Sequence, residues 1–118
     1  MLQQFDSIDR ILHALAEPTR RRMVERLSDG PVSVSALGEP FDMSLAAVLQ
    51  HVQVLEAAGV VRTAKIGRVR TCQLDLSAMR ATEQWMRDRR ATLEQQFDRL
   101  GAFLDATHGP SSSDSELP

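Results

Sequence analysis

The sequence predicts a mainly α-helical domain that carries one small β-hairpin. Three observations support this fold class. Apolar residues recur at steps of three and four through residues 5–55, a strand-like pattern around a glycine occupies residues 60–74, and residues 77–104 hold no proline and one glycine. The chain has 118 residues, of which 42% are hydrophobic and 25% charged. That composition suffices for one domain with its own core and excludes a multidomain enzyme.

Two helices are predicted before residue 30. The first ends near Ala16, and its apolar stripe consists of Phe5, Ile8, Leu12 and Leu15. The second begins at Pro18, because proline suits a first helical turn, and Gly30 followed by Pro31 ends it. Its apolar face consists of Met23, Val24 and Leu27.

A helix-turn-helix is predicted next. Ser33 is expected to cap a brief helix from Val34 to Gly38, which the segment from Gly38 to Asp42 interrupts. Ser44 is expected to cap the following helix, which ends at Gly59. The buried face of that helix is predicted to consist of Val48, Val52 and Leu55.

A hairpin and a long helix complete the chain. Gly67 and Arg68 suit a two-residue type II′ turn between strands near residues 60–66 and 69–74. The last helix runs from about residue 77 to Leu104 and is roughly 40 Å long, too long for so small a domain to cover. Its apolar residues, expected to form a helix-pairing seam, are Met79, Met86, Leu93, Phe97, Leu100 and Leu104. We therefore expect a domain over residues 1–106 and a disordered tail over residues 107–118.

Four helices, a hairpin and a final helix form the order of a winged helix-turn-helix, and the sequence resembles the ArsR/SmtB family of bacterial transcriptional repressors. The segments that carry the resemblance are Ala14–Arg22, Met43–Val48, His51, Leu55–Val61 and Lys65–Arg70. The resemblance implies a homodimer that binds double-stranded DNA, with the helix after Ser44 in the major groove and the hairpin as the wing. It also implies a dimer interface along the first and last helices, formed by Phe5, Ile8, Leu12, Met79, Met86, Leu93, Phe97, Leu100 and Leu104.

The helix after Ser44 has a face suited to reading bases. Opposite its buried face, a helical wheel places Gln50 and Gln53, whose amides match the adenine edge. Leu45, Ala46 and Leu49 offer apolar contact to thymine methyl groups, which predicts an A·T-rich half-site. The alternative is that both glutamines are merely solvated. His51 lies near the buried face and is expected to wedge between helices, with a DNA contact as the second choice.

Cations for phosphate contact come from outside this helix, since residues 39–61 hold none. Residues 17–70 carry eight basic and six acidic side chains, although the whole chain has a net charge of −2. The wing contributes a run without an acidic residue, formed by Arg62, Lys65, Arg68 and Arg70. Arg20, Arg21 and Arg22 form a second cluster, which Glu17 and Glu25 could instead neutralise. The complete set of candidate DNA-binding residues is Ser44, Leu45, Ala46, Leu49, Gln50, His51, Gln53, Arg62, Lys65, Arg68 and Arg70.

No metal or other cofactor is predicted. The helix from Val34 to Gly38 lacks the paired cysteines of the founding family members, and the last helix has no histidine before His108. Cys72, the single cysteine, excludes an internal disulfide and fits a packed strand residue in a reducing compartment. An unknown small apolar effector would suit the region of Trp85 and Met86, although core or interface packing is the commoner role of such residues.

Two classes of function remain at this stage. The first is a DNA-binding regulator, a repressor that binds a palindromic operator as a homodimer. The alternative is a winged-helix adaptor for protein interaction or dimerisation with weak or lost DNA readout, which the uncharged recognition helix keeps open. An enzyme is not predicted, because no phosphate loop, acid pair or nucleophile motif is present. No apolar run reaches the length of a membrane span, so we expect a cytoplasmic protein without a membrane partner.

Overall fold

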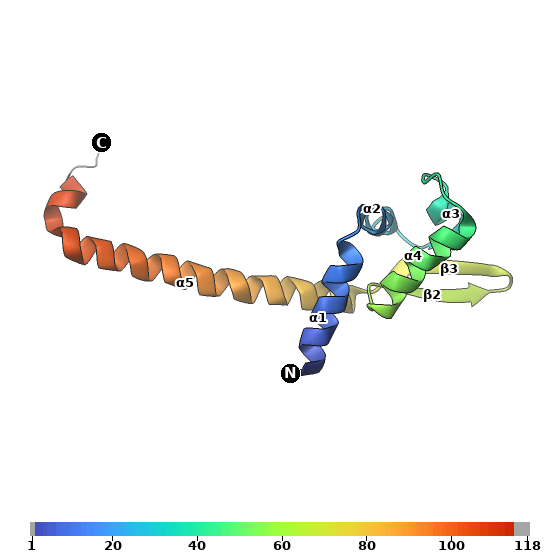
Figure 1. Ribbon diagram of the computed structural model, residues 1–118, viewed down its shortest axis with the longest axis horizontal. Helices are drawn as coiled ribbons and strands as arrows, with labels where there is room; N and C mark the ends of the chain where they lie inside the picture. Colours follow the sequence, from blue (N-terminus) through green and yellow to red (C-terminus); the bar gives the residue numbers. More distant parts are fainter. Residues whose placement is uncertain (1, 115–118) are drawn as a thin grey trace. The chain divides into compact units, whose positions relative to one another are not determined.

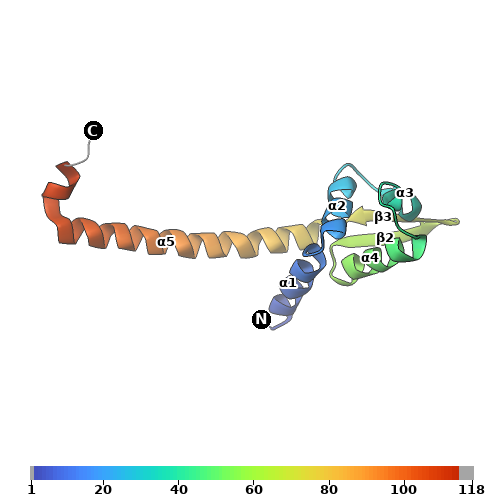
Figure 2. The same ribbon diagram turned by 45° about the horizontal axis from the view of Figure 1, so that its top comes forward.

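The computed structural model describes the backbone of residues 2–114 and the side chains of residues 7–107. The chain divides into two units, one reaching Glu83 and one starting at Gln84. Figures 1 and 2 show the elements in two views. They are α1 (Leu2–Leu15), α2 (Pro18–Leu27), β1 (Val32–Ser33), α3 (Val34–Gly38), α4 (Leu45–Ala57), β2 (Val61–Ile66), β3 (Val69–Leu74) and α5 (Leu76–Asp114).

Local signals set the ends of the elements as the sequence predicts. The hydroxyl of Ser33 accepts the N–H of Ala36, and the hydroxyl of Ser44 accepts the N–H of Ala47, so both serines cap their helices. Gly67 in the hairpin turn has a φ of 65°, and no non-glycine residue described here has a positive φ. A type II′ turn needs a positive φ at its first central residue alone, which confirms the predicted turn.

The core of the first unit lies between the helices and one face of the sheet. Val48, Val52 and Leu55 of α4 are buried in it, as are Met23 and Leu27 of α2. The predicted apolar faces of these two helices are therefore confirmed. Figure 2 shows α4 lying alongside β2. α4 is thus held on a base made of the sheet and the other helices.

The α3–α4 contact is tight because α3 ends in a glycine. A Cβ built on Gly38 would lie 2.5 Å from a methyl carbon of Val48. Real Cβ atoms do not approach that closely, so residue 38 must be glycine for α3 and α4 to pack as they do.

The predicted two-stranded hairpin is part of a three-stranded antiparallel sheet in the order β1-β3-β2. Val32 pairs with Cys72, and Ser33 pairs with Thr71. β1 was not predicted from the sequence, because a segment of two residues is too short to show strand periodicity. Ser33 caps α3 in an extended conformation, and the same conformation lets it pair with β3.

The apolar face predicted for α1 is partly wrong. The residues that α1 buries are Ile8, Ile11 and Ala14, whereas Leu12 is 40% exposed. The core side of α1 is set by its contacts with α4 and α2, and the small side chain of Ala14 permits a close approach there. The side chain of Phe5 lies outside the described residues.

The end predicted for the last helix is also wrong. α5 continues to Asp114, so residues 107–114 are helical and not part of a disordered tail. Pro110 lies within α5, although an interior proline removes one backbone hydrogen bond and its ring crowds the carbonyl four residues earlier. The remainder of the predicted tail, residues 115–118, lies outside the described residues.

Candidate nucleic-acid interface

The helical wheel of α4 is confirmed on its solvent side. Leu45 is 56% exposed, and Ala46, Gln50 and Gln53 are also exposed, as is the capping Ser44. Leu49 is half-buried at the edge of this face. No charged side chain interrupts it before Glu56 in the last turn. Before its last turn, the exposed face of α4 is thus made mainly of methyl groups and amides.

The first turns of α4 and the wing border the same hollow. One groove is lined by Leu45 and Leu49 of α4, by Ser33 of β1, by Val34 and Ser35 of α3, and by Arg68, Val69 and Arg70 of the wing. A second groove, around Gln50 and Gln53, reaches Arg20 on α2. The sequence candidates on α4 and at the wing tip are therefore neighbours in space.

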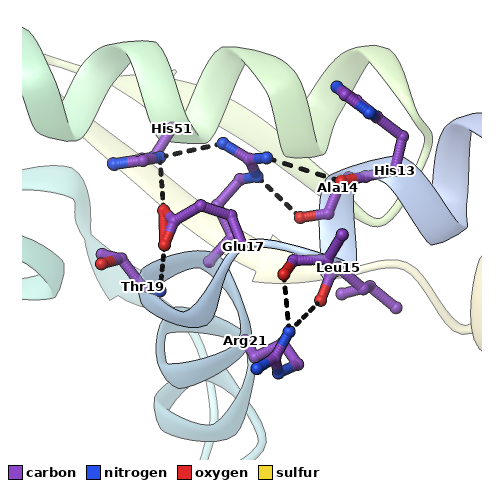
Figure 3. A network of polar contacts seen from close by, with 9 residues as sticks. His13, Ala14, Leu15, Glu17, Thr19, Arg21 and His51 are labelled. Atoms are coloured by element: carbon purple, nitrogen blue, oxygen red, sulfur yellow. Dashed lines mark hydrogen bonds and ion pairs between the residues drawn. The ribbon is translucent and has the colours of Figure 1, made fainter.

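His51 is wedged between α4 and α2, as its position on the wheel predicts. Its Nδ1 lies 3.2 Å from a guanidinium nitrogen of Arg20 and 3.6 Å from a carboxylate oxygen of Glu17 (Figure 3). Because arginine only donates, Nδ1 accepts from Arg20 only when it carries no proton, whereas the ion pair with Glu17 needs a proton on the same atom. The side chain is 21% exposed, so among the DNA-facing candidates His51 is mainly a packing residue.

The cluster at residues 20–22 serves the structure more than the surface. Arg20 donates to the carbonyl of Ala14 at 2.6 Å, and Arg21 donates to the carbonyl of Leu15 at 2.8 Å (Figure 3). These carbonyls end α1, where cations also offset the helix dipole. Arg20 and Arg21 are thus held by these carbonyls and not by the expected pairing with Glu25. Arg22 is exposed.

Glu17 caps α2 at the centre of this network. Its carboxylate accepts the backbone N–H of Thr19, and this bond is the main reason that the pKa of Glu17 is lowered. The charges of His51 and Arg20 lower it further. The sequence predicted only a counter-charge at Glu17, although Pro18 directly after it marks the residue as the position before a helix.

Two of the four wing cations have side-chain partners. Arg62 lies 3.6 Å from the carboxylate of Asp75, and Arg70 donates to the hydroxyl of Thr63 at 3.1 Å. Thr63 in turn donates to Glu56 on α4 at 2.8 Å. The interpretation of four uncompensated cations is therefore wrong, because Asp75 and Glu56 reach the wing from neighbouring elements. Lys65 and Arg68 are exposed and are left as the wing's uncompensated charges in the described part of the chain.

Cys72 packs in the core, as predicted for a lone strand cysteine. It is fully buried, and burial, followed by the charge of Glu56, raises the pKa of its thiol from 9.0 to about 11. Within the described residues, no group of three or more His, Cys, Asp or Glu side chains could hold a metal ion. No helix in that part of the chain is both long and apolar enough to cross a membrane.

The apolar seam of α5 is exposed in the single chain. In the unit from Gln84 onward, Leu93 is 54% exposed and Phe97 is 62% exposed. The other exposed apolar residues of α5 are Leu76, Met79, Met86, Leu100, Phe103 and Leu104. Ile8 of α1 differs, being only 3% exposed, and so offers little surface to a second chain. Trp85 is half-buried, and the guanidinium of Arg89 lies 5.6 Å from the centre of its ring.

Comparison with known proteins agrees with this geometry. A helix-turn-helix domain family matches residues 15–64. The HTH-type transcriptional regulator Rv2034 of Mycobacterium tuberculosis is 40% identical over 80 residues, which cover 68% of this chain and 75% of Rv2034. A crystal structure of the ArsR family transcriptional regulator RHA00566 is 41% identical with a TM-score of 0.71, covering 80% of this chain and 94% of that one. The chain belongs to the ArsR family.

Two further similar proteins extend the comparison. The transcriptional repressor SdpR of Bacillus subtilis is 23% identical over 79 residues, covering 67% of this chain and 88% of SdpR. The solution structure of the homodimeric winged helix-turn-helix domain Mb0332 from Mycobacterium bovis has a TM-score of 0.60 at 21% identity, covering 73% of this chain and 81% of that one. At that identity it shows the fold alone. This ArsR-family chain is a DNA-binding transcriptional regulator.

Proposed function

We propose that this ArsR-family regulator is a repressor that binds an imperfect palindromic operator as a symmetric homodimer. One observation carries the proposal. The same groove is lined by Leu45 and Leu49 of α4 and by Arg68 of the wing, so a base-reading face and a free cation share one surface. A helix in the major groove and a wing on the adjacent backbone would use that surface together.

An A·T-rich half-site fits the exposed chemistry of α4. Gln50 and Gln53 are exposed amides, which pair with the N6 and N7 atoms of adenine. Leu45 and Ala46 would lie against thymine methyl groups, with Leu49 contributing the part of its side chain that remains accessible. Because α4 carries no cation, the protein's affinity for DNA comes from the wing, from helix N-terminal amides and from apolar contact.

A dimer explains the exposed seam on α5. Leu93, Phe97 and Leu100 present apolar surface that a lone helix would leave in water. We propose that a second copy covers this seam together with Leu12 of α1. Two recognition helices would then meet successive major grooves about 34 Å apart, which makes the operator a palindrome. SdpR is a repressor by name, which supports repression here as well.

The cell context and the effector belong to the same proposal. A regulator that binds DNA acts in the cytoplasm, where the buried and weakly acidic Cys72 stays reduced. Trp85 and Met86 are proposed as the place where a small apolar effector would bind. The stacking of Arg89 on Trp85 supports the alternative, in which the ring serves in packing.

A mobility-shift assay on the DNA upstream of the protein's own coding sequence tests the proposal. We expect a specific complex whose affinity falls steeply with salt, because phosphate contacts release counterions. Arg68→Ala should make the fall of log affinity with log salt less steep, by about 0.9 per protomer. A chain that dimerises but binds no duplex would instead be an interaction adaptor, and that result would overturn the proposal.

A further inference from the structure

The wing is tied to the recognition helix by one short chain of hydrogen bonds. Glu56, in the last turn of α4, accepts the backbone N–H of Thr63 at 3.3 Å and its hydroxyl at 2.8 Å. The hydroxyl of Thr63 also accepts a hydrogen bond from Arg70 at 3.1 Å. The chain therefore links α4 to β2 and then to β3.

The chemistry of the three groups allows only one arrangement of protons. A carboxylate accepts and does not donate, whereas a guanidinium donates and does not accept. The single hydroxyl proton of Thr63 must therefore point to Glu56, and its lone pair must face Arg70. Because both ends are charged, these bonds are stronger than bonds between neutral groups.

The strand register places Arg70 on the side of the wing that faces α4. Thr63 pairs with Cys72 and Lys65 pairs with Arg70, so all four side chains share one face of the two strands. Cys72 on that face is buried in the core beside α4. Arg70 thus adds a side-chain link between the outer part of the wing and Thr63, beside the backbone pairing of β2 with β3.

We infer that Glu56 is a positioning residue for DNA binding: through Thr63 and Arg70 it fixes the wing against the recognition helix. Direct contact with phosphate then falls to Lys65 and Arg68, which have no acidic partner among the described residues. This inference rests on the proposed function insofar as wing and helix bind one duplex together. It assigns a role to an acidic residue on a DNA-binding surface, where charge alone would make it unfavourable.

A matched pair of variants separates position from charge. Glu56→Gln and Glu56→Ala remove the same negative charge, but only glutamine keeps an oxygen that accepts from Thr63. If Glu56 acts by position, Glu56→Gln binds DNA at least as tightly as the wild type, and Glu56→Ala binds roughly tenfold more weakly, about the effect of one charge-assisted hydrogen bond. If Glu56 is only a nearby charge, both variants bind equally and more tightly than the wild type, which would overturn the inference.

Thermal unfolding followed by circular dichroism shows whether Glu56→Ala folds. If it does not, Thr63 gives a second pair of variants. Thr63→Ser keeps the hydroxyl and should keep wild-type affinity, whereas Thr63→Val should lose affinity without a change in salt slope. Asp42→Ala removes an exposed acid just before α4 and is the control for charge alone, with affinity expected to stay or rise.

Salt dependence distinguishes Arg70 from Arg68. Arg68→Ala should lower the salt slope by about 0.9 per protomer, and Arg70→Ala should weaken binding with a smaller change of slope. Equal slope changes would assign Arg70 to phosphate contact and refute the division of roles.

The probes are the upstream fragment and an alternating dA and dT duplex of no operator sequence. A wild-type protein that does not prefer the upstream fragment would count against the proposed operator function. The affinities of the Glu56 variants can still be compared on the alternating duplex. A wild-type protein that binds neither probe would overturn both.

Discussion

At the scale of single residues, the same residue type serves different ends in different places. Arg20 and Arg21 donate to the carbonyls at the end of α1. Arg62 pairs with a carboxylate and Arg70 donates to a hydroxyl, whereas Arg68 has no acidic partner in the described structure. Sequence identifies each of them as a cation. Only the neighbours brought by the fold decide which ones remain available for phosphate.

Cys72 offers a prediction about stability at alkaline pH. Its thiol has a pKa of about 11 in the folded chain and 9.0 as an ordinary value, so between pH 9 and 11 the unfolded chain gives up a proton that the folded chain keeps. Stability should therefore fall as pH rises through that window. Urea unfolding measured at both ends of the window checks this expectation.

The Cys72→Ala variant is the control for the alkaline effect. It keeps Lys65, the single lysine, and the sequence has no tyrosine to titrate nearby. The variant should start less stable, because a buried side chain is shortened, but it should lose less stability between pH 9 and 11. Equal losses in the wild type and in the variant would show that another group is responsible.

At the scale of elements, the contact between α3 and α4 fixes how the recognition helix is presented. Gly38→Ala would drive a methyl group into Val48, and overpacking of this kind costs about 1–3 kcal/mol. We expect a matching loss in the free energy of unfolding and weaker DNA binding. Denaturant unfolding gives the first quantity and a mobility shift the second.

Gly101→Ala is the matched control for Gly38. A Cβ at Gly101 meets nothing within 4 Å, and alanine favours a helix interior over glycine by roughly 1 kcal/mol. Stability should stay or rise in that variant. If Gly38→Ala were equally harmless, the tight α3–α4 contact would not be what sets the position of α4.

The elements that sequence predicted correctly are those with local causes. Ser33 and Ser44 cap helices through bonds three residues away, and Gly67 makes its turn through its own φ. The features that it missed join distant residues: β1 forms only because Val32 meets Cys72, and Glu56 reaches Thr63 across a turn. For the same reason the exposed face of α4 was predictable, whereas the partners of the wing cations were not.

At the scale of the whole molecule, basic charge is concentrated in the middle of the chain, and most of the exposed large apolar residues of the described part lie on α5. Residues 17–70 carry two more basic than acidic side chains, and the remaining regions are acidic. The exposed apolar residues of α5 follow this basic part of the chain. That division suits a protein whose middle contacts a polyanion and whose last helix contacts a second copy.

The dimer gives a prediction at this scale. Leu93→Asp places a charge in the exposed seam of α5 and should shift sedimentation equilibrium toward monomer, with operator affinity falling because two half-sites are no longer bound together. Gln95→Asp is the control, since residue 95 lies about 200° around the helix from residue 93. Unchanged assembly in Leu93→Asp would remove the seam from the dimer interface.

Footprinting of the protein on its own upstream DNA shows whether it binds a palindromic operator. We expect two protected A·T-rich half-sites related by a palindrome, with centres about 10 base pairs apart, and weaker protection of both in a Gln50→Ala variant. A single protected block without symmetry, or protection that Gln50→Ala leaves unchanged, would contradict this expectation.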